Sequence, residues 1–265
     1  MKIMLAFARQ GIVLAFSYKI AYWMGLFNTI IKIFVFYSLW YFLHEQNPNI
    51  FPVIKEQILA YGVISVIISD LIEWWDGPHF YIGRQIRLGL ITTDLLKPVY
   101  FPLQVFHLWT GNRIAKIVTT IFPAIIIVNL LLPLSLPHSI LTVAQSVLSI
   151  FFAYLIVYSL NFLVGMLCFR TINMMGIMHA YHALIMLFSG MLIPLWFYPD
   201  WLRGVCELLP FSGLFYIPLS IYIGNIVEAD AWNSIAFQFV WLLILIIVCQ
   251  IVWLRTHKHL VIQGG

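Results

Sequence analysis

The amino-acid sequence predicts an all-α membrane protein with six transmembrane helices, organised as a single transmembrane domain over residues 1–265. Hydrophobic residues make up 63% of the chain and charged residues only 9%, whereas soluble domains average roughly 45–50% and about 25%. The apolar residues also occur in blocks of about 20, the length that a helix needs to cross a hydrocarbon core about 30 Å thick. These two observations exclude a soluble globule. The blocks show none of the short alternating segments that are typical of a transmembrane barrel.

The six predicted spans follow one another along the whole chain. Their approximate ranges are 20–43, 56–75, 113–133, 142–168, 174–197 and 232–254. The segment before them, residues 1–18, is apolar and carries only Lys2 and Arg9 as charges, with no small-residue cleavage site. It predicts a retained amphipathic helix that lies along the membrane surface.

Basic residues lie mainly on one side of this six-span topology. That side carries Lys2, Arg9, Lys19, Arg84, Arg87, Lys97, Arg113, Lys116, Arg170, Arg255 and Lys258, and the other side only Lys55 and Arg203. Because positively charged loops stay in the cytoplasm, we expect a multi-pass protein of the cell membrane with both termini cytoplasmic. The net charge of +4 therefore reflects topology. It does not indicate a nucleic-acid partner, since the basic residues form no run or patch.

The cytoplasmic stretch from Asp76 to Lys116 is far longer than the median loop of ~4–6 residues. Within it, apolar Ile86, Leu90 and Leu95 alternate with polar Arg84, Arg87 and Asp94. This pattern predicts a short amphipathic helix that Pro98 ends. The helix either rests on the membrane interface or docks into a groove of a cytoplasmic partner.

The segment from Ser189 to Pro218 interrupts the end of the fifth span. It contains Pro194, Pro199 and Pro210, so one straight helix cannot run through it. The piece at 200–209 is too short to cross, and the segment around it is rich in aromatic residues, with Trp196, Phe197, Tyr198 and Trp201. We expect it to dip back into the outer leaflet, or else to form an ordinary loop in the aromatic belt.

The order of these features resembles the membrane subunits of type-2 ABC exporters. The likeness rests on Ile86-Arg87-x-Gly89 followed by Leu95-Leu96-Lys97-Pro98, on the run from Phe188 to Leu202, and on Leu209-Pro210-Phe211. The closing Gln263-Gly264-Gly265 is similar to the tail of a little-characterised branch of that family. The resemblance covers nearly the whole chain.

The resemblance implies roles for three segments. It makes the surface helix an elbow, the first cytoplasmic loop a coupling helix for a nucleotide-binding subunit, and the broken segment a set of outward-facing re-entrant helices. The implied coupling residues are Arg84, Ile86, Arg87, Gly89, Leu90, Asp94, Leu95 and Leu96. The implied re-entrant or gate residues are Gly190, Pro194, Pro199, Asp200, Trp201, Pro210 and Phe211.

The chain contains no GxxxxGK[ST] loop to hold the phosphates of ATP and its magnesium ion. We therefore expect it to be no enzyme and to carry no catalytic residue, metal or cofactor of its own. ATP and magnesium would bind to a separate ABC ATPase subunit. The resemblance further implies a second permease subunit, identical or homologous, because six helices form half of a pathway in this family.

A few polar residues within the spans leave other readings open. His179 and His182 lie three residues apart and either pack between helices or bind a metal. Asp70 and Glu73, near the cytoplasmic end of the second span, are packing or gating candidates that would face water or basic partners such as Arg113 or Lys116. Lys32, in the first span, either snorkels or lines a pathway.

Two alternative functions are an intramembrane enzyme, which the histidines and buried carboxylates would carry, and a secondary transporter. GxSxG and HExxH motifs are absent, and only the fifth span is broken, whereas a secondary transporter favours breaks in both halves. The transported substrate stays open, because the aromatic and aliphatic residues that could line a route are also those of any lipid-facing helix.

Overall fold

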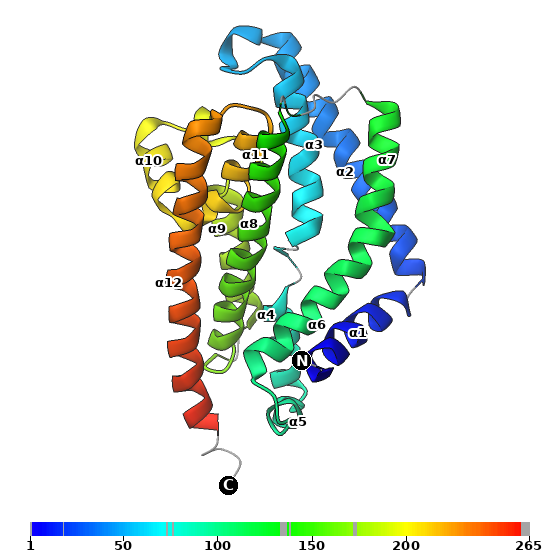
Figure 1. The fold of residues 1–265 in the computed structure, drawn as a ribbon, viewed down its shortest axis with the longest axis vertical. Helices are drawn as coiled ribbons and strands as arrows, with labels where there is room; N and C mark the ends of the chain where they lie inside the picture. Colours follow the sequence, from blue (N-terminus) through cyan, green and yellow to red (C-terminus); the bar gives the residue numbers. More distant parts are fainter. Residues whose placement is uncertain are drawn as a thin grey trace.

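The computed structural model describes residues 2–17, 19–72, 74–75, 77–132, 137, 139–171 and 174–260. Within these ranges the chain is helical throughout and contains no β-strand, which confirms the predicted class (Figure 1). The helices are α1 Lys2–Phe16, α2 Lys19–Gln46, α3 Lys55–Ile72, α4 Pro78–Arg87, α5 Ile91–Leu95, α6 Phe101–Lys116, α7 Phe122–Leu131, α8 Ile140–Leu167, α9 Met174–Phe188, α10 Asp200–Leu208, α11 Tyr216–Tyr222 and α12 Glu228–Leu260. Shorter turns are η1 Pro48–Ile50, η2 Ile117–Ile121, η3 Leu195–Phe197 and η4 Pro210–Gly213.

Helices occupy all six predicted spans. Within the described residues, four are long and apolar enough to cross a membrane: Trp23–Gln46, Phe101–Leu131, Ile140–Leu167 and Glu228–Thr256. The other two predicted spans correspond to α3, which has 18 residues and contains Lys55, Glu56 and Asp70, and to α9, which has 15 residues.

The third and fifth predicted spans have different boundaries in the structure. The third helical run begins at Phe101 instead of residue 113, because Pro102 occupies the first turn, where its missing N–H is not needed. The fifth helix ends at Phe188 instead of residue 197. There Gly190 adopts a left-handed φ of 76°, and a Cβ at this position would lie only 3.0 Å from Tyr216 Cβ.

The elements gather into two groups that meet along α3 and α8. In one group, α8 packs along α12 and against α11; in the other, α2 packs on α3 and α1 on α6. The largest buried cluster is built mainly from α3, α8 and α9. In Figure 1 the N-terminal end of α1 and the C-terminal end of α12 lie toward the end of the molecule that carries α5, whereas α10 and α11 lie toward the opposite end.

Two glycines bring α1 and α6 into close contact. A Cβ at Gly11 would lie 2.2 Å from the Leu108 carbonyl oxygen, and one at Gly111 would lie 1.9 Å from the Ala8 carbonyl oxygen. Small residues at a helix crossing allow the backbones to approach in this way. α1 is therefore fixed on α6, and its apolar residues Leu5 and Val13 stay exposed.

Candidate functional site

The segment between α3 and α6 forms two short helices instead of the single amphipathic helix that the sequence predicts. α4 ends at Arg87, and α5 begins at Ile91. Gly89 lies between them with a φ of 70°, a left-handed conformation that other residues rarely adopt. The left-handed glycine ends the first helix. The residues of the predicted amphipathic face are therefore divided between α4 and α5.

Asp94 ties this hairpin of helices together. Its carboxylate accepts hydrogen bonds from Tyr81 (2.7 Å), Gln85 (3.0 Å) and Gln104 (3.1 Å), and it forms an ion pair with Lys97 (2.6 Å). The side chain is only 3% exposed. Burial raises the pKa of the Tyr81 phenol, and the hydrogen bond to Asp94 raises it further. Asp94 therefore holds α4, α5 and α6 together and offers no surface for a partner.

The apolar residues of the hairpin divide into a buried and an exposed set. Ile86 and Leu95 pack against the buried cluster that contains Phe101. Leu88 is 54% exposed, Leu90 45% and Leu96 84%. Of the implied coupling residues, Leu90 and Leu96 are thus the apolar ones at the surface. Leu88 joins them as a residue that sequence reasoning missed, because its position on the turn became clear only with the bend at Gly89.

The broken segment after α9 is anchored to α3 and α11. The Tyr61 hydroxyl donates to the Gly190 carbonyl oxygen (2.6 Å), and the Tyr216 N–H donates to the Ser189 carbonyl oxygen (2.9 Å). The short helix expected at 200–209 is present as α10, and α11 follows it.

The implied re-entrant residues again form two sets. Gly190, Pro194 and Pro210 are buried, and Phe211 is half-buried. Pro199, Asp200 and Trp201 are exposed, with Trp201 at 72%. The buried set shapes the bend, and the exposed set faces the surroundings of the molecule.

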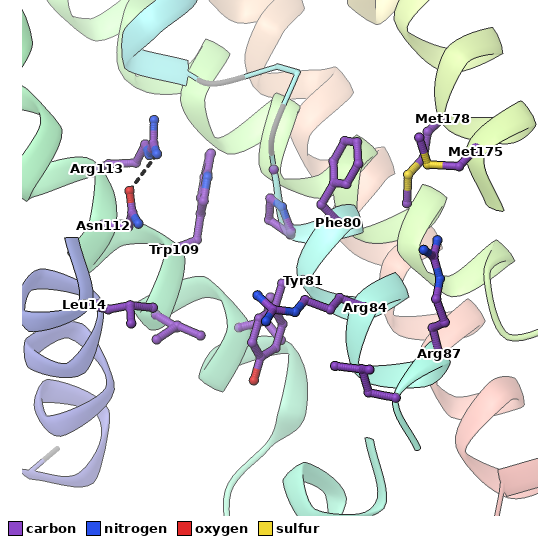
Figure 2. Close-up of a pocket in the computed structure, with 16 residues that line it drawn as sticks. Leu14, Phe80, Tyr81, Arg84, Arg87, Trp109, Asn112, Arg113, Met175 and Met178 are labelled. Atoms are coloured by element: carbon purple, nitrogen blue, oxygen red, sulfur yellow. Dashed lines mark hydrogen bonds between the residues drawn. The ribbon is translucent and has the colours of Figure 1, made fainter. Parts of the chain in front are cut away.

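A cavity of about 680 Å³ lies beside the hairpin, between α1, α4, α6 and the start of α9. Arg84 and Arg87 extend from α4 and Arg113 from α6 around the same hollow (Figure 2). The Arg113 guanidinium donates to Asn112 (2.7 Å) and to the Asp70 carbonyl oxygen (3.3 Å). The sequence placed Arg113 at the membrane boundary, and only the packing of α6 on α4 makes it part of this site.

Asp70 is a buried carboxylate at the centre of a charge cluster. The Lys32 and Lys116 ammonium groups each lie 3.8 Å from its carboxylate, and the Thr29 hydroxyl donates to it. The expected pairing of Asp70 with basic neighbours is confirmed, and Lys32 joins them. Glu73 and Asp76 lie outside the described residues.

The two histidines of α9 differ in burial. His179 is exposed, whereas His182 is buried and stacks on Trp75 with ring centroids 4.2 Å apart. Its buried neighbour is His79 of α4, at 5.3 Å between centroids. Burial and the proximity of His182 lower the pKa of His79 to about 3, so this imidazole is neutral at physiological pH. The described residues contain no group of three or more His, Cys, Asp or Glu side chains that could hold a metal ion.

The long apolar helices define the chain as a multi-pass helical membrane protein. A family model described as ABC-2 family transporter protein matches residues 26–264. The chain therefore belongs to the ABC-2 transporter family, as the resemblance indicated, and is an ABC transporter permease, a transport component that is not itself catalytic. No curated protein and no protein of solved structure matches the chain.

Proposed function

We propose that this chain is the membrane subunit of an ATP-driven exporter and forms half of its translocation pathway. A separate ABC ATPase binds ATP and magnesium, and a second permease subunit, identical or homologous, completes the pathway. Membership of the ABC-2 family supports the partnership with an ATPase. The same membership favours transport over the alternatives of an intramembrane enzyme and a secondary transporter.

The topology in this proposal has six crossings, with both termini, α4 and α5 in the cytoplasm. It rests on the distribution of Lys and Arg and agrees with the common end at which α5, the start of α1 and the end of α12 lie (Figure 1). α1 is then an elbow along the inner leaflet. α10 and α11 are the outward-facing re-entrant helices, and exposed Trp201 sits in the interface.

The observation that carries the coupling role is the leucine surface, defined as exposed Leu88 and Leu90 at the turn between α4 and α5 together with exposed Leu96 directly after α5. Isolated exposed leucines are common on proteins. These three, however, belong to one short hairpin, and the hydrogen bonds of Asp94 tie that hairpin to α6. Exposed apolar side chains on a well-anchored hairpin are suited to fill a pocket on a partner, because buried anchor residues carry most of the binding energy of an interface. We infer that this leucine surface docks into the ATPase.

Charging the leucine surface tests the docking. Leu90→Asp combined with Leu96→Asp should leave membrane insertion intact, since both side chains are exposed. Burying two carboxylates in the interface should weaken ATPase association by at least tenfold, because an unpaired buried charge costs about 2 kcal/mol or more. Co-purification of the ATPase and substrate efflux are measured in the same membranes.

Thr92→Asp is the matched control, because it adds a carboxylate to an exposed polar position of α5. It should retain the ATPase. If the double leucine variant also binds the ATPase and exports normally, the leucine surface is not the coupling element.

A further inference from the structure

The cavity between α1, α4, α6 and α9 combines a strongly positive charge with an apolar lining. Three of its residues are the arginines Arg84, Arg87 and Arg113. Of the 16 lining residues that the structure describes, none is an aspartate or a glutamate. Such a concentration of guanidinium groups, with no carboxylate among the described lining residues, favours an anionic ligand.

The arginines differ in how they are held. Arg113 is 5% exposed and is oriented by its hydrogen bonds to Asn112 and to the Asp70 backbone. Arg84 and Arg87 lie one helical turn apart on α4, and no ion pair joins them to a carboxylate in the described part of the chain. Their guanidinium groups are therefore available to a ligand. Guanidinium binds phosphate through two parallel hydrogen bonds, which lysine cannot do.

The remaining walls are apolar and partly aromatic. Leu14 of α1, Phe80 of α4, Trp109 of α6 and Met178 of α9 face the same hollow (Figure 2). The volume of about 680 Å³ is within the range of about 300–1,000 Å³ that is usual for small-molecule sites. α1 borders the cavity and carries exposed apolar side chains such as Val13. A ligand with a charged head and a hydrocarbon tail matches both the lining and its neighbourhood.

We propose that this arginine cavity binds the phosphate-bearing head group of an anionic amphiphile at the inner leaflet. This inference rests on the proposed export function insofar as the amphiphile is the cargo; the same head-group chemistry also occurs in a resident bilayer lipid. Because Arg84 and Arg87 belong to α4, a bound head group touches the helix that leads into the leucine surface. Occupancy of the cavity is thereby linked to the position of the coupling hairpin.

The binding test uses the full-length chain in phosphatidylcholine nanodiscs and two fluorescent probes with the same tail, a phosphatidic acid and a diacylglycerol. The wild-type chain should bind the phosphatidic acid at least about tenfold more tightly, given the strength of charge-assisted hydrogen bonds. Arg84→Gln with Arg87→Gln should reduce its affinity to that of the diacylglycerol. Arg84→Lys with Arg87→Lys should be intermediate and more sensitive to salt.

Arg203→Gln is the matched control, since Arg203 lies on α10 and pairs with Glu207 at 2.7 Å. It should bind the phosphatidic acid as the wild type does. If the wild type binds both probes equally, it does not recognise the phosphate, and this result alone would overturn the inference. Full binding of the phosphatidic acid by the double Gln variant would overturn it as well.

Proteoliposomes that also contain the ATPase distinguish the two sources of the head group. ATP-dependent movement of the phosphatidic acid probe to the other leaflet identifies cargo, and binding without movement identifies a resident lipid; both results support the site. If the exporter function is wrong, the ATPase does not associate and the phosphatidic acid probe does not move between leaflets. The nanodisc measurement would still show whether the probe binds to the arginine cavity.

Discussion

At the scale of single residues, Asp94 shows how burial changes the meaning of a sequence motif. The resemblance placed it among residues that face the ATPase, but its carboxylate is directed inward to Tyr81, Gln85 and Gln104. Removing a buried group that accepts several hydrogen bonds lowers the stability of the fold, because the donors are left buried without partners. Asp94 therefore supports the hairpin that carries the leucine surface without being part of that surface.

Replacing Asp94 should loosen the hairpin. Asp94→Ala leaves the Tyr81 hydroxyl and the Gln104 amide without their acceptor, and we expect a local destabilisation of roughly 3 kcal/mol. Lys97 adds little to this figure, since its side chain is 42% exposed. The measurement is the rate of tryptic cleavage after Arg87 in membranes, which should rise about a hundredfold if cleavage follows local opening.

Asp94→Asn should be milder, because the amide oxygen still accepts hydrogen bonds. Thr93→Ala serves as a control, since the Thr93 hydroxyl donates only to the backbone carbonyl of Leu90 within the described contacts. A wild-type cleavage rate in Asp94→Ala would show that the carboxylate does not hold the hairpin.

At the scale of elements, the crossing of α1 and α6 determines whether the arginine cavity is closed on one side. The contact depends on backbone approach at Gly11 and Gly111, where no Cβ can fit. α1 is thus held against α6 by close backbone packing, in accord with the small residues found at helix contacts in membranes.

A side chain at this crossing should separate the two helices. In Gly111→Leu, a Cβ would fall 1.9 Å from the Ala8 carbonyl oxygen, so α1 has to move away from α6. Spin labels at Gln10→Cys and Ile114→Cys, both at exposed positions, should report a longer and broader distance distribution.

The matched control is Gly204→Leu in α10, where an added Cβ meets nothing within 4 Å. This variant should keep the wild-type distance distribution. If Gly111→Leu keeps it too, α1 is not fixed by the glycine contact.

At the scale of the whole molecule, the distribution of Lys and Arg predicts which loops face the cytoplasm and which face the outside. A cysteine at Val227, which is 64% exposed before α12, should react with an impermeant thiol reagent added outside cells. A cysteine at Arg87 should react only after permeabilisation. The native cysteines Cys168, Cys206 and Cys249 are first replaced, and reversed accessibility at both sites would refute the cytoplasmic placement of the termini and the coupling hairpin.

The sequence by itself determined the class of protein and the interruption after α9, but not the break at Gly89. Apolar block length, charge asymmetry and the positions of Pro and Gly are local properties, and they located helices at all six spans and the interruption after α9. The family resemblance, carried by short motifs in a fixed order, was confirmed. The start of α6 was missed, because its buried polar residues Gln104 and Arg113 resemble those of a loop when read one after another.

Only the tertiary structure decided which face of each short helix is buried. The exposure of Leu96 and the burial of Asp94 in adjacent turns follow from the bend at Gly89 and from contacts with α6. The meeting of Arg84 and Arg113 at one cavity joins residues 29 positions apart by number. Periodicity specifies the faces of one helix, but the neighbour that covers each face is set by packing between distant segments. For that reason the leucine surface and the arginine cavity could not be predicted from the sequence alone.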